Sequence, residues 1–335
     1  MKILIVGPAW VGDMVIAHAL VRTLRAESSA THVHMLAPES TEPLARRMPG
    51  VTGTTVLPVA HGELGWGARR RLGRELRKPR FDRAIVLPNT AKSALVPLFA
   101  DIPRRTGWRG EWRYGLLNDM RSLNEARYPR MVDRFVALGR AAGAAPTNDL
   151  LPQLTADSRR AGELIGALGI AADAPVLALC PGAEYGPAKR WPAAHFAAVA
   201  EAHLRRCGTV WLLGTHADAP ACAAIIAALP ERLRARAFDL AGRTTLLDAV
   251  DLLARADQVV TNDSGLMHVA CALGVSVVAV YGSSSPDFTP PLSNRARVLR
   301  EPLPCSPCFE RTCPLGHTDC LNRLTPERVV RELVN

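Results

Sequence analysis

The chain has 335 residues, of which 48% are hydrophobic, 5% aromatic and 21% charged. This composition is ordinary for a globular protein and excludes disordered, collagen-like and coiled-coil chains. The formal charge of +10 lies entirely in residues 1–150, which hold 23 Lys and Arg against 13 Asp and Glu, whereas residues 151–335 hold 18 of each. We therefore expect two domains with different partners, the first of which meets an anionic group such as phosphate, carboxylate or a membrane headgroup.

The sequence shows no pattern of a membrane span or a removable leader. One lysine precedes the apolar run of residues 3–6, which is far too short for the apolar region of a signal peptide. The longest apolar stretch, residues 266–282, contains His268 and Gly274 and is short for a span. We interpret it as a buried helix, a glycine stop and a buried strand. The expected location is the cytoplasm.

Short apolar runs alternate with helical patterns along the first half of the chain. Runs of Val, Ile and Leu that are apolar on both faces and separated by helices are typical of a parallel sheet covered on both sides. The predicted strands are 2–6, 33–36 and 83–87, and the predicted helices are 13–26, 42–47 and 91–100. Turn and breaker residues gather between residues 139 and 157, and we place the domain boundary there, after residue 150.

The same alternation restarts after this boundary and is clearer. The predicted strands are 176–180, 210–213, 238–240, 258–261 and 276–281, and the predicted helices are 193–206, 219–228, 246–255 and 265–273. This series is a complete doubly wound domain. The predicted fold is thus α/β, with two Rossmann-like domains, 1–150 and 151–335. Ligands bind at the carboxyl ends of the strands in such sheets, so we expect a site in a cleft between the domains.

A turn with an acidic residue follows the first predicted strand. Residues 7–13 lead from that strand into a helix, whose dipole and free amide groups attract anions. The turn has neither the G-x-G-x-x-G spacing of a dinucleotide site nor the Gly-Lys-Ser/Thr of a P-loop. Asp13 is therefore either the N-cap of the helix or, in a cleft lined by basic groups, a general base.

Two loops of the second half have the pattern of phosphate-binding segments. The Gly/Pro-rich loop 180–192 carries Lys189 and Arg190, and lysine supplies a point charge while arginine supplies a planar fork. The alternative is an exposed loop with an incidental basic pair.

The second of these loops, residues 261–268, delivers small polar residues from a buried strand into a helix. Ser264 and Gly265 can offer amide groups to a diphosphate while Asp263 caps the helix. The alternative is an ordinary capped turn, in which His268 is a packed polar residue.

Arginines concentrate in two stretches of the first half, residues 69–83 and 104–134. A solvated helix face explains much of the first stretch. The second contains Trp108, Trp112 and Tyr114 among its arginines, a pattern that also suits nucleic acid. No RNA- or DNA-binding motif accompanies it.

Four cysteines gather near the C-terminal end of the chain. Cys305, Cys308, Cys313 and Cys320 have the spacing C-x2-C-x4-C-x6-C, with His317 among them. The cluster has the compactness of a structural zinc site, but its spacings fit no standard zinc template well. Free or partly disulfide-bonded thiols are the alternatives.

Several of these motifs together resemble the lipopolysaccharide heptosyltransferases of glycosyltransferase family 9, over essentially the whole chain. The segments that carry the resemblance are Gly12-Asp13-Met14, residues 181–192, residues 261–268, residues 281–286 and Cys305-Ser306-Pro307-Cys308. The resemblance implies a GT-B fold with the donor nucleotide on the second domain and the acceptor on the first. It also implies inverting transfer of L-glycero-D-manno-heptose from ADP-heptose to the first heptose of the inner core, without a metal or cofactor.

The resemblance also implies roles for individual residues. Asp13 is the expected general base. The expected donor-binding residues are Glu184, Lys189, Arg190, Asp263, Ser264, Gly265 and His268, and we expect Gly12, Arg104, Arg109 and Arg113 to bind the acceptor. Some family members carry a ribose-binding glutamate after the second strand of the second domain; here that loop is Gly214-Thr215-His216-Ala217-Asp218, so no residue is assigned to the ribose.

The partners implied are ADP-heptose, a Kdo-lipid A acceptor that already carries one heptose, and the inner leaflet of the cytoplasmic membrane, with no nucleic acid. Two other functions remain as alternatives. One is another two-domain nucleotide-sugar enzyme, such as a non-hydrolysing epimerase, and the other is a basic nucleic-acid-binding protein.

Overall fold

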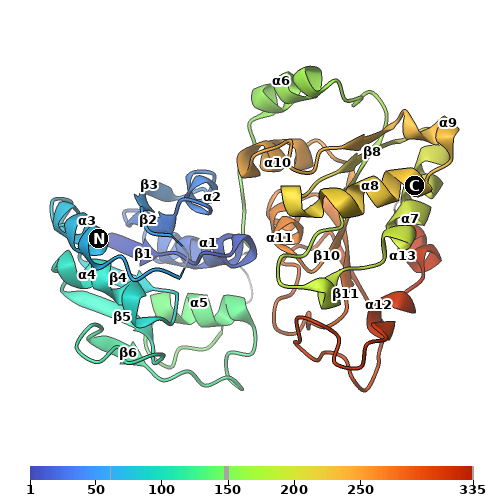
Figure 1. The fold of residues 1–335 in the computed structure, drawn as a ribbon. Helices are drawn as coiled ribbons and strands as arrows, with labels where there is room; N and C mark the ends of the chain where they lie inside the picture. The colour runs from blue at the N-terminus through green and yellow to red at the C-terminus, as the bar shows by residue number, and fades with distance from the viewer. Residues whose placement is uncertain (61, 147–150, 334–335) are drawn as a thin grey trace. The chain divides into compact units, whose positions relative to one another are not determined.

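The computed structural model describes residues 1–60, 62–146 and 151–333 (Figure 1). The chain divides into two compact units, Met1–Leu154 and Thr155–Asn335. The division falls four residues after the boundary placed from the sequence, at residue 150, which itself lies outside the described residues. We describe each unit by itself.

The first unit contains a six-stranded sheet in the order β3-β2-β1-β4-β5-β6, and its neighbouring strands pair in parallel. Its strands are β1 (Lys2–Val6), β2 (His32–Pro38), β3 (Val51–Leu57), β4 (Arg83–Val86), β5 (Arg104–Trp108) and β6 (Asp119–Arg121). The sequence predicted β1, β2 and β4. It missed β3, which is rich in threonine and half-buried, and β5 and β6, which are short and carry arginines.

Helices cover both faces of this sheet (Figure 1). They are α1 (Val11–Glu27), α2 (Glu42–Arg46), α3 (Trp66–Glu75), α4 (Leu95–Phe99) and α5 (Met131–Gly139). Leu4 and Val6 of β1 pack in one core cluster with Leu72 of α3 and Val96 of α4. The predicted helix 91–100 is a 3-10 turn, Ala91–Ala94, followed by α4.

The second unit repeats the architecture, with the strand order β12-β11-β10-β7-β8-β9. Its strands are β7 (Val176–Cys180), β8 (Thr209–Leu212), β9 (Ala237–Asp239), β10 (Gln258–Asn262), β11 (Ser276–Tyr281) and β12 (Ala296–Arg300). The five strands predicted from the sequence are confirmed. Only the edge strand β12, whose residues are partly or fully exposed, gave no apolar signal.

The helices of the second unit are α6 (Ser158–Leu168), α7 (Ala193–Arg205), α8 (Ala219–Ala228), α9 (Glu231–Arg234), α10 (Leu246–Leu253), α11 (Gly265–Ala272), α12 (Asp319–Asn322) and α13 (Pro326–Glu332). The last two return the end of the chain to the core. Leu321 and Val329 join the cluster that contains Phe196, and the indole of Trp191 donates a hydrogen bond to the carbonyl of Leu324 at 2.9 Å. The segment after β12 is therefore an integral part of this unit.

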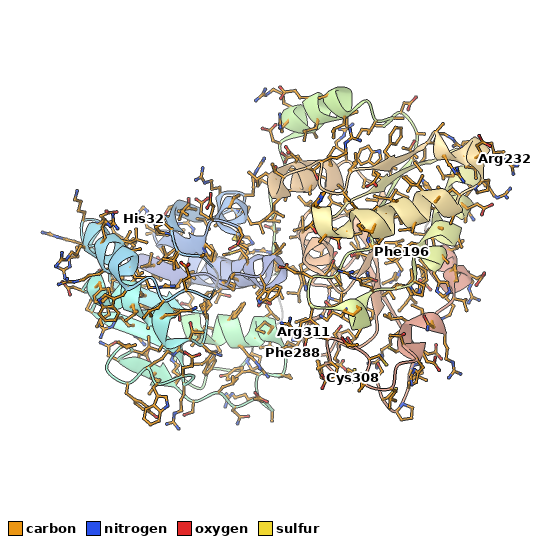
Figure 2. The ribbon with its side chains drawn as sticks, viewed as in Figure 1. His32, Phe196, Arg232, Phe288, Cys308 and Arg311 are labelled. Atoms are coloured by element: carbon orange, nitrogen blue, oxygen red, sulfur yellow. The ribbon has the colours of Figure 1, made fainter. Side chains whose placement is uncertain are left out.

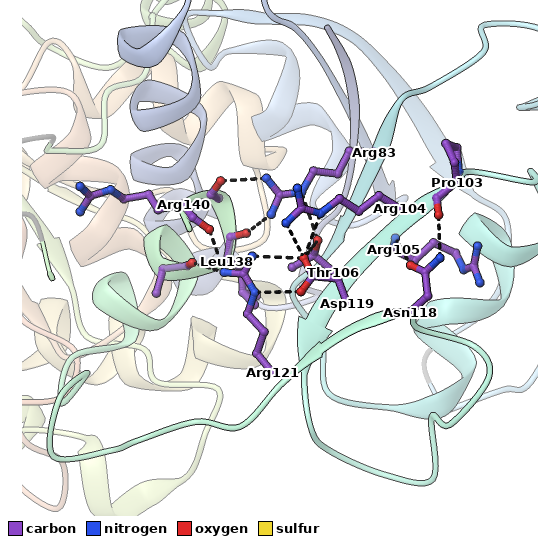
Figure 3. Close-up of polar contacts among 12 residues, drawn as sticks. Arg83, Pro103, Arg104, Arg105, Thr106, Asn118, Asp119, Arg121, Leu138 and Arg140 are labelled. Atoms are coloured by element: carbon purple, nitrogen blue, oxygen red, sulfur yellow. Dashed lines mark hydrogen bonds and ion pairs between the residues drawn. The ribbon is translucent and has the colours of Figure 1, made fainter. Parts of the chain in front are cut away.

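A network of arginines around Asp119 fixes α5 to the sheet of the first unit (Figure 3). The carboxylate of Asp119 accepts hydrogen bonds from Arg104 at 2.9 Å, Arg121 at 3.2 Å and Thr106 at 2.9 Å. Burial alone would raise the pKa of Asp119, but the bonds from Arg121, Thr106 and Arg104 outweigh it and lower the pKa to about 2. Arg104 was expected to bind the acceptor, but its guanidinium already binds the carboxylate of Asp119.

Two arginines also cap α5: Arg121 and Arg83, which joins the network by donating to the hydroxyl of Thr106 at 3.1 Å. Arg83 donates to the carbonyls of Leu138 at 2.5 Å and Gly139 at 2.8 Å, and Arg121 donates to those of Ala137 and Arg140, each at 2.8 Å. The last carbonyls of a helix have no partners within it, and the negative end of its dipole favours cations. Part of the positive surplus of the first half is therefore structural rather than ligand-binding.

We predict that Asp119→Asn lowers the free energy of unfolding by about 2 kcal/mol at neutral pH, because it leaves partly buried arginines without a counter-charge. The native pKa of about 2 lies below the ordinary value of 3.8. The carboxylate therefore contributes its full stability above about pH 4 and loses it as the pH falls towards 2.

Urea unfolding at several pH values tests this. Asp101→Asn is a matched control, because Asp101 pairs with Arg77 on an exposed surface and such pairs contribute little. Equal effects of the two substitutions would contradict the role assigned to Asp119.

Candidate active site

The carboxyl edge of the second sheet brings together two loops that are distant in the sequence. Strands β7 and β10 are neighbours, so the loop after β7 and the turn after β10 meet at this edge. The Nζ atom of Lys189 lies 2.6 Å from Oδ2 of Asp263, and the side chains are 17% and 5% exposed. The sequence expected these two residues on the donor side, and the structure places them in direct contact.

Asn262, which directly precedes Asp263 in the sequence, links the two loops by hydrogen bonds. Its side-chain amide donates to the carbonyl of Pro181 at 2.7 Å, and its side-chain oxygen accepts the backbone N–H of Trp191 at 3.0 Å. Asn262 is fully buried. It therefore sets the geometry in which Lys189 meets Asp263, and the sequence analysis did not assign it a role.

The turn after β10 differs in one respect from the expectation. Ser264, not Asp263, occupies the N-cap position of α11, in extended backbone conformation and without a side-chain capping bond. Its hydroxyl lies 3.2 Å from that of Thr261, and Asp263 pairs with Lys189. The prediction that Asp263 caps the helix is wrong. The amide groups at the start of α11 have no side-chain cap and are suited to an anionic ligand.

His268 lies in α11 one turn after this start and is buried. Burial lowers its pKa to about 4; the charge of Asp263 acts in the raising direction and that of Lys189 in the lowering direction. The imidazole is therefore neutral at pH 7, beside an ion pair whose two charges oppose each other.

Two other predicted donor residues, Glu184 and Arg190, lie on the loop after β7, in different surroundings. Arg190 points towards Asp218, with 3.8 Å between Nη2 and Oδ1, and Asp218 accepts the backbone N–H and hydroxyl of Thr215 at 2.9 and 2.8 Å. Asp218 thus joins the loop after β7 to the loop after β8. Glu184 is exposed.

In the first unit, Asp13 lies in the first turn of α1, where Trp10 is the N-cap residue. The alternative in which Asp13 is itself the N-cap is wrong. Its negative charge lies near the positive end of the helix dipole, where a carboxylate interacts favourably with the helix. Asp13 and the adjacent Gly12 are both half-buried.

The three arginines predicted to bind an acceptor do not share one environment. Arg113 is 0% exposed and donates to the carbonyls of Pro88, at 2.7 Å, and Trp108. It therefore holds a loop together and has no exposed surface for a ligand. Arg104 is bound to Asp119, as described above. Arg109 is exposed.

The four clustered cysteines are free thiols. With Ala188, Ser283 and His317 they line one small cavity of about 20 Å³. Across the described ranges, no set of three or more His, Cys, Asp or Glu residues is arranged so that it could hold a metal ion. Likewise, no helix among the described residues is long and apolar enough to cross a membrane.

Two doubly wound units, one with a cation and uncapped helix amides at the carboxyl edge of its sheet, define a two-domain α/β protein. A family model, glycosyltransferase family 9 (heptosyltransferase), matches residues 69–319. The chain belongs to this family and is a glycosyltransferase. This membership favours neither the epimerase nor the nucleic-acid-binding alternative.

Individual relatives agree with the family. The chain is 47% identical to lipopolysaccharide heptosyltransferase 2 of Salmonella typhimurium, covering 99% of this chain and 97% of the relative. It is similar in structure to E. coli ADP-heptose LPS heptosyltransferase II, with a TM-score of 0.88, 45% identity and coverage of 99% and 97%. A family 9 glycosyl transferase from Veillonella parvula shares the fold, with a TM-score of 0.86, 20% identity and coverage of 99% and 95%. The GT-B fold class is thereby confirmed.

We predict that the ring of His268 titrates near pH 4 in the folded protein. Because this pKa is below the ordinary value of 6.5, protonation opposes folding. The stability that the neutral ring contributes is complete above about pH 6.5 and declines as the pH falls towards 4. NMR titration of the histidine ring signals measures this pKa, and the spectrum of His268→Gln identifies the signal. A midpoint near 6.5 would contradict the burial of the ring.

Proposed function

We propose that the protein transfers L-glycero-D-manno-heptose from ADP-heptose to the first heptose of a Kdo-lipid A acceptor, with inversion at the anomeric carbon. The observation that carries the proposal is the Lys189–Asp263 pair beside the amides of α11, in a chain so similar to lipopolysaccharide heptosyltransferase 2. The second unit then binds the donor and the first binds the acceptor.

On the donor side, Lys189 exchanges part of its contact with Asp263 for the diphosphate of ADP-heptose. The amides of Ser264 and Gly265 add hydrogen bonds at the positive end of α11. Charge grows on the β-phosphate as the bond to the anomeric carbon breaks, and fixed cations and amides stabilise that charge. ADP leaves as a stable anion, so this side needs no protonated acid.

On the acceptor side, Asp13 is the general base. Its carboxylate accepts the proton of the acceptor hydroxyl while the oxygen bonds to the anomeric carbon, on the face opposite the departing ADP. A well-placed base contributes roughly 10²–10⁴-fold to the rate. A carboxylate in the first turn of a helix remains ionised, and therefore able to accept a proton, at neutral pH.

We predict that Asp13→Asn folds normally, still binds ADP, and loses at least about 10²-fold in transfer rate, because the amide cannot accept the proton. Mass spectrometry of the product measures transfer, and calorimetry measures ADP binding. Lys189→Ala is the contrasting variant, for which weaker ADP binding is expected. Near-normal turnover by Asp13→Asn would remove Asp13 as the base. Thermal stabilisation of the protein by UDP or GDP as strong as that by ADP would overturn the donor assignment.

The first unit is also proposed to associate with the inner face of the inner membrane, where its glycolipid acceptor lies. Such an acceptor carries phosphates and carboxylates, and anionic leaflets attract basic proteins. In the same stretch of sequence as exposed Arg109, Trp112 is 88% exposed and Tyr114 63% exposed, with ring centroids 6.3 Å apart. Tryptophan and tyrosine favour the interface between lipid and water.

We predict that the protein binds vesicles containing anionic lipid, that binding weakens between low and physiological salt, and that Trp112→Ser weakens it further. Co-sedimentation with vesicles of neutral and of mixed anionic composition measures this. Phe309→Ser, which removes an exposed aromatic side chain from the second unit, is the control. Binding that is insensitive to salt and to Trp112→Ser would overturn the membrane proposal and leave the transferase proposal standing.

A further inference from the structure

The cysteine-rich tail, residues 305–320, returns to the loop that carries Lys189 (Figure 2, which labels Cys308 and Arg311 in this tail). The backbone N–H of Ala188 donates to the carbonyl of Arg311 at 3.0 Å, and the hydroxyl of Tyr185 donates to the carbonyl of Phe309 at 2.6 Å. The N–H of Phe309 in turn donates to the carbonyl of Ser283, after β11, at 2.6 Å. The tail is thus hydrogen-bonded to two loops at the carboxyl edge of the sheet.

The approach of the tail to the loop is close enough to require a glycine. A Cβ atom added to Gly186 would lie 2.4 Å from the carbonyl oxygen of Arg311, a distance that real Cβ atoms do not show. Because that oxygen is a backbone atom, a larger side chain at this position would displace the tail. Tyr185, which bonds to the tail, and Gly186, which leaves room for it, therefore both suit the packing of the tail against this loop.

This packing places two cations around one aromatic ring. The Nζ atom of Lys189 lies 5.0 Å from the centroid of the Tyr185 ring, and Cζ of Arg311 lies 5.2 Å from it. The two cations are thus within about 10 Å of each other, whichever faces of the ring they occupy. Lys189 has Asp263 as a counter-charge, whereas Arg311 has none among the ion pairs of the described residues.

Arg311 is therefore a cation beside this site to which no ion pair of the described residues gives a counter-charge. The contact with the ring orients the guanidinium and reduces the entropy lost when it binds a ligand. Arginine presents a planar fork that matches phosphate oxygens, whereas lysine acts as a point charge. A single phosphate group can contact one of these two cations, whereas a diphosphate can contact both.

We propose that Arg311 is a binding residue for the diphosphate of the donor and that the cysteine-rich tail is the element that positions it. The inference rests on the proposed function and adds a residue to the same site. It also gives the tail a role in nucleotide binding that needs no bound metal. Tyr185 is the positioning residue, because its ring holds the guanidinium and its hydroxyl anchors the tail.

Calorimetric titration of the full-length protein with ADP and with AMP tests the proposal. We expect Arg311→Ala to raise the dissociation constant of ADP about tenfold and that of AMP much less. The reason is that AMP lacks the second phosphate group, which the proposal assigns to contact with Arg311. Arg311→Lys should recover part of the ADP affinity. Arg323→Ala is the matched control, because Arg323 is also exposed and follows the tail; it should leave both constants unchanged. Thermal melting checks that each variant is folded.

The outcomes separate this inference from the proposed function. An ADP affinity that is unchanged in Arg311→Ala but reduced in Lys189→Ala overturns the role of Arg311 and leaves the donor site intact. Equal losses for ADP and AMP in Arg311→Ala overturn the assignment to the diphosphate. Failure of the wild-type protein to bind ADP overturns the proposed donor and this inference with it.

Discussion

The ion pair between Lys189 and Asp263 joins two loops that are 74 residues apart in the sequence. They meet because β7 and β10 are neighbours in a parallel sheet, so that both strands end at the same edge. Removing two charges from water is costly, and a largely buried pair is therefore weak evidence for a purely stabilising role. In the proposed function, a lysine held in place by one carboxylate, next to uncapped helix amides, is a cation prepared for an anionic ligand.

The rest of the second unit keeps this pair in position. Asn262 bonds to both ends of the Lys189 loop, and Trp191, where that loop ends, is itself held by Leu324 near the end of the chain. His268 stays neutral in the core beneath, so it adds no charge that would compete with Lys189 for the ligand. The site therefore depends on contacts from three parts of the chain: the loop after β7, the turn after β10, and the segment after β12.

The sequence was sufficient to predict β1, β2 and β4 of the first sheet and every strand but the edge strand β12 of the second. It was weakest where polar residues make structural contacts. Strands such as β7 and β11 are buried on both faces and produce unbroken apolar runs, whereas β5 and β6 contain arginines that bond to Asp119 and to helix carbonyls. Arg113 illustrates the same limit: its pattern among aromatic residues indicated a surface for a ligand, yet it is fully buried. Charge patterns do not distinguish an arginine that binds a ligand from one that binds a carbonyl group, because both depend on tertiary contacts.

The same reasoning explains why Lys189 and Asp263 were predicted individually while Arg311 was not assigned to the site. Each of the first two lies in a loop that directly follows a predicted strand, so the topology of the sheet places it at the ligand edge. Arg311 lies in a segment without regular structure, and only the hydrogen bonds from Ala188 and Tyr185 reveal where that segment goes. Binding residues on such segments are found through the loops that they contact. In the proposed donor site, the tail, whose backbone is bonded to the loop that carries Lys189, is therefore part of the binding surface, whatever the cysteines within it do.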